Sequence, residues 1–459
     1  MRTAPPRPRN AIPLHTPGPA TLAVTAAATA LALMNYTAPM VTLPAMADAF
    51  GTPPSAQAWL FNGTPLGLAA LLLVAGALAD AHGRRRVFLL GTLALGVTTA
   101  LGAFAGTTAL FTAARIAQGA ASAAVLAGSL GLLAVAYPSG RDRIRATGLW
   151  GASVSGGIAL GPLLAGALSP ADWRLAYATL GAAALLTAAV GTRTLAPPAR
   201  RPAGGRPDLA GAATLTLALA ALLTALTLGR DGWLRPVIGL LLLASAALTA
   251  LFVVVEREAG RRGGNPMIDL GLLRKPAFRV ATAGALFTGL AVIGLFSIVP
   301  ALLQRGTGMS PLAAAWLSVV WSGTAFTAAL QARRLAPHLS APHQLALGFA
   351  LSAAGVLALL GTLDSPALPW GRLITGLVVS GAGSGLLNAA LPRLAVDSVP
   401  PERAAMGSGA NNTARYIGSA AGVALMLALS ATGPDTALLT GAALALAGTV
   451  LTAAGSPRR

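Results

Sequence analysis

The sequence has no cysteine, only four histidines and a single lysine, Lys275, in 459 residues. Without cysteine, disulfide bonds, a thiolate nucleophile and Cys-based metal or iron–sulfur sites are excluded. His15, His82, His338 and His343 are scattered along the chain rather than grouped with carboxylates. Catalysis or metal binding needs such a cluster. The sequence therefore predicts no enzyme, no metal site and no cofactor.

Acidic residues are also scarce, with 13 Asp and Glu against 32 Lys and Arg. Charged residues make up only 10% of the chain and hydrophobic residues 55%, which is too apolar for the surface of a soluble protein of this length. We therefore expect an integral membrane protein that lies in a lipid bilayer.

Fourteen apolar segments are long enough to cross a bilayer core of roughly 30 Å as helices. They fall at about 20–45, 57–79, 87–106, 108–135, 146–168, 173–194, 209–228, 235–255, 279–303, 312–332, 342–362, 370–391, 404–430 and 435–455. The expected fold class is all-α, with both termini on one side of the membrane.

The net charge of +19 reports topology rather than nucleic-acid binding, because the cations lie in short loops between the apolar segments. On the side of the termini these loops and tails hold 25 Lys and Arg, the opposite side holds five, and two fall inside spans. The positive-inside rule then predicts cytoplasmic termini in a bacterial inner (plasma) membrane. The coding bias towards Ala, Gly, Leu and Arg is typical of high-GC bacteria.

Two long basic loops, 192–208 and 256–279, bracket a pair of spans without central polar residues. This pattern predicts two six-helix bundles with two extra helices between them. The expected divisions are a tail at 1–19, an N-terminal bundle at 20–194, linkers and extra helices at 195–278, a C-terminal bundle at 279–455 and a tail at 456–459.

The second and third spans are joined by Gly76-Ala-Leu-Ala-Asp80-Ala-His-Gly83-Arg84-Arg85-Arg86. An acid at a helix end followed by glycine and a cation cluster can hold a loop against a neighbouring helix in one conformation and release it in another. The alternative is a hairpin whose cations serve topology alone.

Two arginines lie inside spans: Arg115, followed by Gln118 and Gly119, and Arg415. A charge at that depth costs about 2.5 to 3.5 kcal/mol on insertion scales, so each should face the protein interior and serve a function. The alternatives are a snorkelling Arg115 that binds backbone carbonyls and a helix-end Arg415 that reaches the interface.

Closely spaced glycines mark the span at 146–168, with Gly157, Gly161, Pro162 and Gly166. Glycine at four-residue spacing allows two helices to approach closely, and an internal proline bends a helix. Ordinary bundle packing would use the same glycines.

These motifs resemble those of the major facilitator superfamily, specifically its fourteen-helix drug:proton antiporter branch, over nearly the whole chain. The 76–86 loop matches the signature between helices 2 and 3, although Ala81 stands where a basic residue is usual. Arg115 matches the arginine motif of helix 4, and Gly157 to Gly166 the antiporter motif of helix 5. The first span carries Asn35-Tyr36-Thr37 and a closing Leu43-Pro44, with Asn35 where that branch usually has aspartate.

The resemblance implies a monomeric secondary exporter of a drug-like or antibiotic small molecule, driven by exchange for protons, in which two bundles rock around a central cavity. A facilitator or importer of a metabolite and a non-transporting receptor or scaffold are the alternatives. The candidate residues of the exporter's central cavity are uncharged polar side chains and aromatic side chains. The polar candidates are Asn35, Tyr36, Thr37, Gln304, Asn411 and Asn412, and the aromatic candidates are Trp59, Trp316, Trp321 and Phe296.

No span has a carboxylate near its centre. With Arg115 and Arg415 as the buried charges, the cavity should favour neutral or anionic amphiphiles over lipophilic cations. Proton coupling would then involve Asp80, a boundary acid such as Asp48, or Arg115 together with the substrate.

Overall fold

Fourteen helices in the described part of the chain are long and apolar enough to cross a membrane, which confirms the predicted number of spans and the all-α class. The computed structural model describes residues 19–137, 140–196, 209–229, 234–261, 270–335, 338–365, 367–400 and 404–454. The side on which α1 begins and α16 ends is called the terminal face below, and the other side the opposite face.

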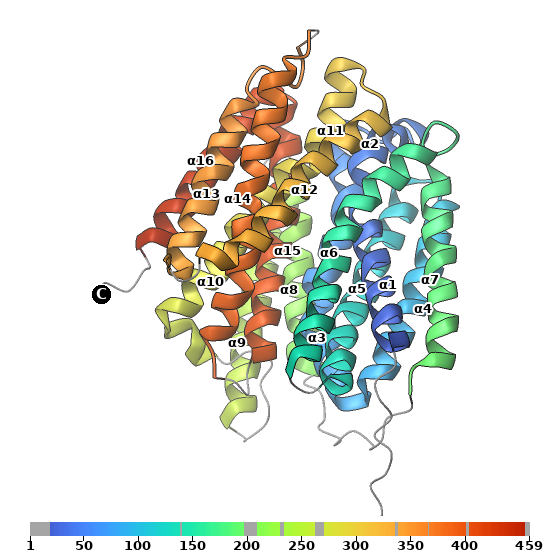
Figure 1. Ribbon diagram of the computed structural model, residues 1–459, viewed down its shortest axis with the longest axis vertical. Helices are drawn as coiled ribbons and strands as arrows, with labels where there is room; N and C mark the ends of the chain where they lie inside the picture. The colour runs from blue at the N-terminus through green and yellow to red at the C-terminus, as the bar shows by residue number, and fades with distance from the viewer. Residues whose placement is uncertain are drawn as a thin grey trace, which may run out of the picture.

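Two sets of helices lie side by side (Figure 1). The N-terminal half comprises α1 (Pro19–Thr37), α2 (Pro39–Ala49), η1 (Pro54–Ala56), α3 (Gln57–His82), α4 (Arg84–Ala103), α5 (Thr108–Ala136), α6 (Gly140–Leu168) and α7 (Arg174–Thr194). Next come α8 (Leu209–Leu228) and α9 (Pro236–Arg261). The C-terminal half comprises η3 (Leu270–Arg274), α10 (Pro276–Phe287), the π-helical turn η4 (Thr288–Ile293), α11 (Gly294–Thr307), α12 (Pro311–Leu335), α13 (Ala341–Ala358), α14 (Trp370–Asp397), α15 (Ala404–Ser430) and α16 (Pro434–Ala454).

The first and ninth predicted spans differ from single regular helices. The span at 20–45 is interrupted at Ala38, because Pro39 has no backbone N–H to continue the hydrogen-bond ladder. The span at 279–303 contains η4, whose Gly289 and the following Gly294 lie against α15. A π-turn inserts an extra residue into a helical turn and so changes which residues share a face.

Glycine sets the distance between helices within each half. A Cβ on Gly67 of α3 would lie 2.7 Å from the backbone nitrogen of Ala120 on α5, which is closer than side chains allow. In the C-terminal half, a Cβ on Gly294 of α11 would lie 2.6 Å from the Cα of Gly422 on α15. Backbones this close gain packing energy in a bilayer, where the hydrophobic effect does not drive helix association.

The two halves meet along a seam formed by α3 and α15, and α8 packs against both of these helices. Leu223 of α8 contacts Leu66 of α3 and Ala420 of α15 in one buried cluster. The α8 hydroxyl of Thr216 donates to the backbone oxygen of Ala70 at 3.1 Å. In contrast, α9 contacts chiefly α8 and η3 and exposes a row of large apolar side chains, as expected next to lipid.

Candidate functional site

Arg115 of α5 is fully enclosed by protein. Its Nη1 donates to the backbone oxygen and the Oδ1 of Asn35, both at 2.7 Å, and to Oε1 of Gln118 at 3.0 Å. Its Nη2 donates to the backbone oxygen of Tyr36 at 3.4 Å. All four of these acceptor oxygens belong to uncharged groups. The guanidinium is therefore held by dipoles and hydrogen bonds instead of a carboxylate, and this binds α5 to α1.

Proline explains why a backbone carbonyl is available to Arg115. In a regular helix the carbonyl of Asn35 would accept from the N–H of residue 39, which is Pro39 and has none. The freed oxygen accepts from Arg115 instead. The Asn35 amide completes the network by donating to Oγ1 of Thr99 on α4 at 2.6 Å.

The asparagine that replaces the usual aspartate thus uses both ends of its amide. Its Oδ1 accepts from Arg115, and its Nδ2 donates to Thr99. A carboxylate at this position could accept from Arg115 but could not donate to Thr99 unless it were protonated. The Asn35 side chain therefore joins α1, α4 and α5 without any ionisation.

The second span arginine, Arg415 of α15, is only partly buried. Its Nη2 donates to Oδ1 of Asn412 at 3.0 Å, and its Cζ lies 5.5 Å from the ring centre of Tyr416. Asn411 is buried and donates to the backbone oxygen of Ala281 on α10 at 3.1 Å. These groups form intrahelical and interhelical contacts within the C-terminal half.

Hydrogen bonds connect the two halves at the centre of the seam. The hydroxyl of Tyr36 lies 2.8 Å from that of Ser419 on α15, and both residues are buried. Asn62 of α3 donates to the backbone oxygen of Ala420 at 2.9 Å. The Tyr36 ring also packs edge-on against Tyr416.

Replacing Tyr36 with Phe should lower the free energy of unfolding by about 0.5–1.5 kcal/mol, because one buried hydrogen bond between the halves is lost. Once Tyr36 is Phe, Ser419→Ala should cost little more, since its partner is already gone. Thermal unfolding of the purified single and double variants measures this coupling. If the losses of stability in the two single variants add up in the double variant, the two hydroxyls do not interact.

The arginines of the 76–86 loop bind the ends of neighbouring helices. Gly83 joins α3 to α4 with a φ of 98°, a conformation that favours glycine. Arg84 donates to the backbone oxygen of Gly131 on α5 at 3.1 Å. Arg85 donates to the carbonyls of Thr192 and Leu195 at the end of α7, both at 2.9 Å. Cations are favourable at these carboxyl ends.

Other parts of that motif are less informative. Asp80 lies in α3, but its side chain is outside the described residues, and Gly76 faces open space. The contacts of Arg84 and Arg85 described above lie within the N-terminal half, so they stabilise that half internally. The gating role stays a prediction.

The glycine motif of α6 lies against two helices. A Cβ on Gly157 would lie 2.5 Å from the carbonyl oxygen of Ala30 on α1, and Gly161 lies equally close to Met34. Gly166 instead contacts the start of α12 in the other half, where a Cβ would lie 2.8 Å from the oxygen of Pro311. Pro162 lies inside the helix between these contacts.

The halves contact each other at the opposite face, and α3 and α15 also stay in contact along the seam. The helices α6 and α12 touch near their ends at the opposite face and diverge towards the terminal face (Figure 1). At the opposite face, Gln304 of α11 donates to the backbone oxygen of Val41 at 3.0 Å, and Arg305 donates to Gln57 at 2.9 Å. Figure 1 shows α2 and α11 close together there. Towards the terminal face, Gly151 of α6 and Gly323 of α12 have no atom near the place of a side chain.

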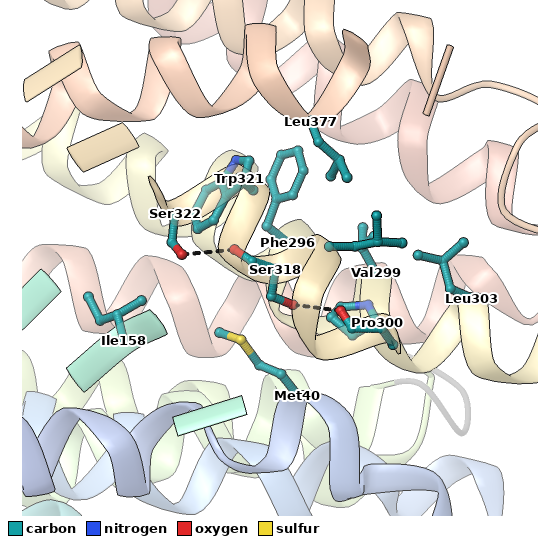
Figure 2. Close-up of a pocket in the computed structure, with 12 residues that line it drawn as sticks. Met40, Ile158, Phe296, Val299, Pro300, Leu303, Ser318, Trp321, Ser322 and Leu377 are labelled. Atoms are coloured by element: carbon teal, nitrogen blue, oxygen red, sulfur yellow. Dashed lines mark hydrogen bonds between the residues drawn. The ribbon is translucent and has the colours of Figure 1, made fainter. Parts of the chain in front are cut away.

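A small cavity lies between the halves (Figure 2). The residues that line it are Met40 of α2, Ile158 of α6, Phe296, Val299, Pro300 and Leu303 of α11, Ala314, Leu317, Ser318, Trp321 and Ser322 of α12, and Leu377 of α14.

Two of the four aromatic candidates, Phe296 and Trp321, line this cavity, whereas Trp316 is 57% exposed on the outer side of α12 and Trp59 packs near α8. The six polar candidates are not among the lining residues. Besides the contacts of Asn35, Tyr36, Gln304 and Asn411 described above, Thr37 donates to the carbonyl of Leu33 and Asn412 to that of Ser408. Their part in substrate binding stays a prediction.

Sequence reasoning missed several lining residues, among them Met40 and Ile158. A signal was present in the sequence, because each lies four residues before a proline within its helix, Pro44 and Pro162. Phe296 has the same relation to Pro300. Proline kinks therefore mark the walls of the cavity on three helices.

Residues 25–423 match the family model of the Major Facilitator Superfamily. A probable actinorhodin transporter of Streptomyces coelicolor is 31% identical over 89% of this chain and 71% of its own length. The puromycin resistance protein pur8 of Streptomyces alboniger is 31% identical over 91% and 82%, and the cephamycin export protein CmcT of Amycolatopsis lactamdurans is 32% identical over 90% and 86%. Together with its fourteen spans, these likenesses confirm the resemblance of the motifs, and the chain belongs to the major facilitator superfamily.

Proposed function

We propose that this protein is a secondary exporter of a drug-like or antibiotic small molecule, that it exchanges this molecule for protons, and that it works by alternating access. One observation carries the proposal: a cavity lies between two halves that are in contact at the opposite face and separate along α6 and α12 towards the terminal face. The relatives are named as a transporter, a resistance protein and an export protein, and these names support transport out of the cell.

We propose that the terminal face is cytoplasmic, since 25 Lys and Arg belong to loops and tails on that side and five to the other. The described conformation would then admit substrate from the cytoplasm or the inner leaflet. A state open to the opposite face would require the hydrogen bonds of Gln304 and Arg305 to break. Residues 195–278 would then lie between the two bundles that move relative to each other.

Proton coupling is proposed to involve Arg115 or acids at the boundaries, such as Asp80 and Asp48. The network of Arg115 spans α1 and α5, so a substrate or proton that perturbs it would change the packing of the N-terminal half. Asp80→Asn is the direct test of the first acid. If pH-driven transport persists in that variant, Asp80 is not the coupling group.

Transport is tested by expressing the chain in an efflux-deficient bacterium and measuring susceptibility to a panel that includes puromycin and a cephamycin. Compounds that lose potency are then followed in everted membrane vesicles energised by respiration. We expect uptake into these vesicles and its loss on adding a protonophore. Uptake that is indifferent to the protonophore, or none for any compound by a protein shown to be folded, would reject proton-driven export.

Alternating access predicts a specific pattern of chemical labelling. The chain has no natural cysteine, so Gln57→Cys with Arg305→Cys places one reactive pair across the opposite face, where the native side chains are hydrogen-bonded at 2.9 Å. A short bifunctional thiol reagent should crosslink this pair and stop transport. A third cysteine, Gly151→Cys, should still react with a thiol reagent applied from the terminal face.

The control is the same reagent on the single variant Gln57→Cys, which can be labelled but not crosslinked and should remain active. A crosslinked protein that transports at the normal rate would contradict alternating access. Loss of labelling at Gly151→Cys after crosslinking would contradict the assignment of the open face.

A further inference from the structure

The space between the two halves has two lateral sides, and one of them is closed. On this side α3 and α15 stay in contact along the seam. Asn62 donates to the backbone oxygen of Ala420 at 2.9 Å, and further towards the terminal face a Cβ on Gly409 would lie 2.7 Å from Cδ2 of Leu73. From Asn62 to Leu73 the helix rises about 16 Å, roughly half of a bilayer core. The contact therefore closes this side across the middle of the membrane.

The helix α8 covers this contact from outside. Leu219 and Leu223 share one face of α8, since they are four residues apart. Leu219 belongs to a buried cluster with Tyr416 of α15 and several residues of α3, and Leu223 fills a second cluster between the same two helices. Behind them, Ser245 of α9 donates to the backbone oxygen of Ala218 of α8 at 2.9 Å. Two helices thus separate the closed side from lipid.

The other side lies between α6 and α12, away from α8. Figure 1 shows α6 and α12 at the front and α8 behind them. Near the opposite face, a Cβ on Gly166 would lie 2.8 Å from the oxygen of Pro311. About four turns closer to the terminal face, Gly151 has no atom near the place of a side chain, and Phe326 is 38% exposed. The two helices therefore border a gap that widens towards the terminal face.

The gap leads to the small cavity and has no charged edge. Ser155 lies between Gly151 and Ile158 on one face of α6, and Ile158 and Ser322 line the cavity. Residues 146–168 and 311–332 contain no Asp, Glu, Lys or Arg. A charged compound would find no counterion along these helices, whereas an uncharged apolar one needs none.

We propose that substrate reaches the space between the halves sideways, from the lipid leaflet at the terminal face, through the gap between α6 and α12. The helix α8 closes the equivalent route between α3 and α15, so entry is one-sided. The substrate class that fits this route is an amphiphile that dissolves among lipid tails in an uncharged form. This entrance rests on the proposed function and names the side from which the exporter takes its substrate.

Spin labels test whether the gap opens to lipid or to water. The chain has no natural cysteine, so Ser155→Cys and Ser322→Cys each carry one nitroxide in the gap, and Ile417→Cys carries one under α8. The purified full chain is placed in phosphatidylcholine bilayers. Power saturation then measures collisions with oxygen, which dissolves among lipid tails, and with a nickel chelate, which stays in water.

We expect oxygen collisions to exceed nickel collisions several-fold for the two labels in the gap, and both to be rare for the label under α8. Dominant nickel collisions in the gap would show an aqueous entrance and overturn the proposal. Frequent oxygen collisions under α8 in the otherwise unaltered protein would overturn its one-sidedness.

A matched pair of α8 variants assigns the cover. Leu219→Ala removes a side chain that packs against the seam, so oxygen collisions of the label at Ile417→Cys should rise several-fold. Leu217→Ala makes the same change two residues away, where the side chain is 55% exposed, and should leave the collisions unchanged. Equal responses to the two substitutions would overturn the role of α8 as the cover.

A second pair of variants tests entry itself. Ser155→Trp narrows the gap and should slow uptake into energised everted vesicles several-fold, for each compound that the susceptibility panel identifies. Leu160→Trp adds a large ring to the same helix where Leu160 is 51% exposed, and should leave uptake unchanged. Thermal unfolding verifies that both variants fold. A folded Ser155→Trp protein with a normal rate would overturn entry between α6 and α12.

The two proposals fail in different ways. Protonophore-sensitive transport together with dominant nickel collisions in the gap would reject the lipid entrance and leave the exporter standing. Dominant oxygen collisions in the gap, without energised transport of any compound, would keep an opening to lipid and reject the exporter.

Discussion

Arg115→Lys is expected to reduce transport by roughly tenfold or more, although the positive charge is retained. The guanidinium uses two nitrogens to reach four acceptors on α1 and α5. A single ammonium nitrogen cannot occupy both positions, so at least one buried oxygen loses its donor. Initial rates in energised everted vesicles, normalised to folded protein, measure the effect.

Arg279→Lys is the matched control, because Arg279 is exposed near the start of α10. It should leave transport unchanged. Arg115→Lys keeps the charge but changes the geometry of the hydrogen-bond donors, whereas Asn35→Asp keeps the shape of the side chain but adds a charge. Comparing transport by the two variants therefore separates the effect of geometry from that of charge. If Arg115→Lys transports normally, the fixed fork of hydrogen bonds at Asn35 is not needed, and charge alone at this depth suffices.

Gly157→Ala should be strongly disruptive although it adds only a single methyl group to α6. The added carbon would lie 2.5 Å from the carbonyl oxygen of Ala30 and 2.9 Å from the Cβ of Leu33, so α1 and α6 must separate. Overpacking of this kind costs about 1–3 kcal/mol, and occasionally more. We expect a lower unfolding temperature together with slower transport, because α1 also holds the acceptors of Arg115.

The adjacent glycine provides the control. Gly156 has no atom near the position of a side chain, and alanine is favoured over glycine within a helix by about 1 kcal/mol. Gly156→Ala should therefore be neutral or slightly stabilising. Equal effects of the two substitutions would mean that helix propensity, rather than the contact between α1 and α6, decides the outcome.

Local properties of the chain predicted the number of spans and the family, because the length of an apolar run is matched directly to bilayer thickness. The buried arginine was predictable for the same reason: a charge within a span is costly and must be compensated. Its partners were not, because the contact of Arg115 with the Asn35 carbonyl depends on Pro39 and on the packing of α1 against α5.

The cavity shows the limit most clearly. Polarity drew attention to Asn411 and Gln304, which bond to backbone within or between the halves. The walls are instead mostly apolar, and the one local feature of Met40 and Ile158 is a proline four residues later in each helix, which does not by itself say that the side chain faces a cavity. Which side chains face a space between helices depends on kinks and tilts that act over the whole fold.

The parity of membrane crossings explains why two helices, α8 and α9, rather than one lie between the two halves. Each membrane crossing reverses the direction of the chain, so a single added helix would invert the C-terminal half relative to the membrane. The pair α8 and α9 keeps the parity even. The helix α8 contacts both halves, whereas α9 lies mainly against α8 and lipid. The role of α9 is therefore to bring the chain back across the membrane. Deleting both would preserve the topology but uncover the junction of α3 and α15, so a twelve-helix version of this protein would need a new surface there.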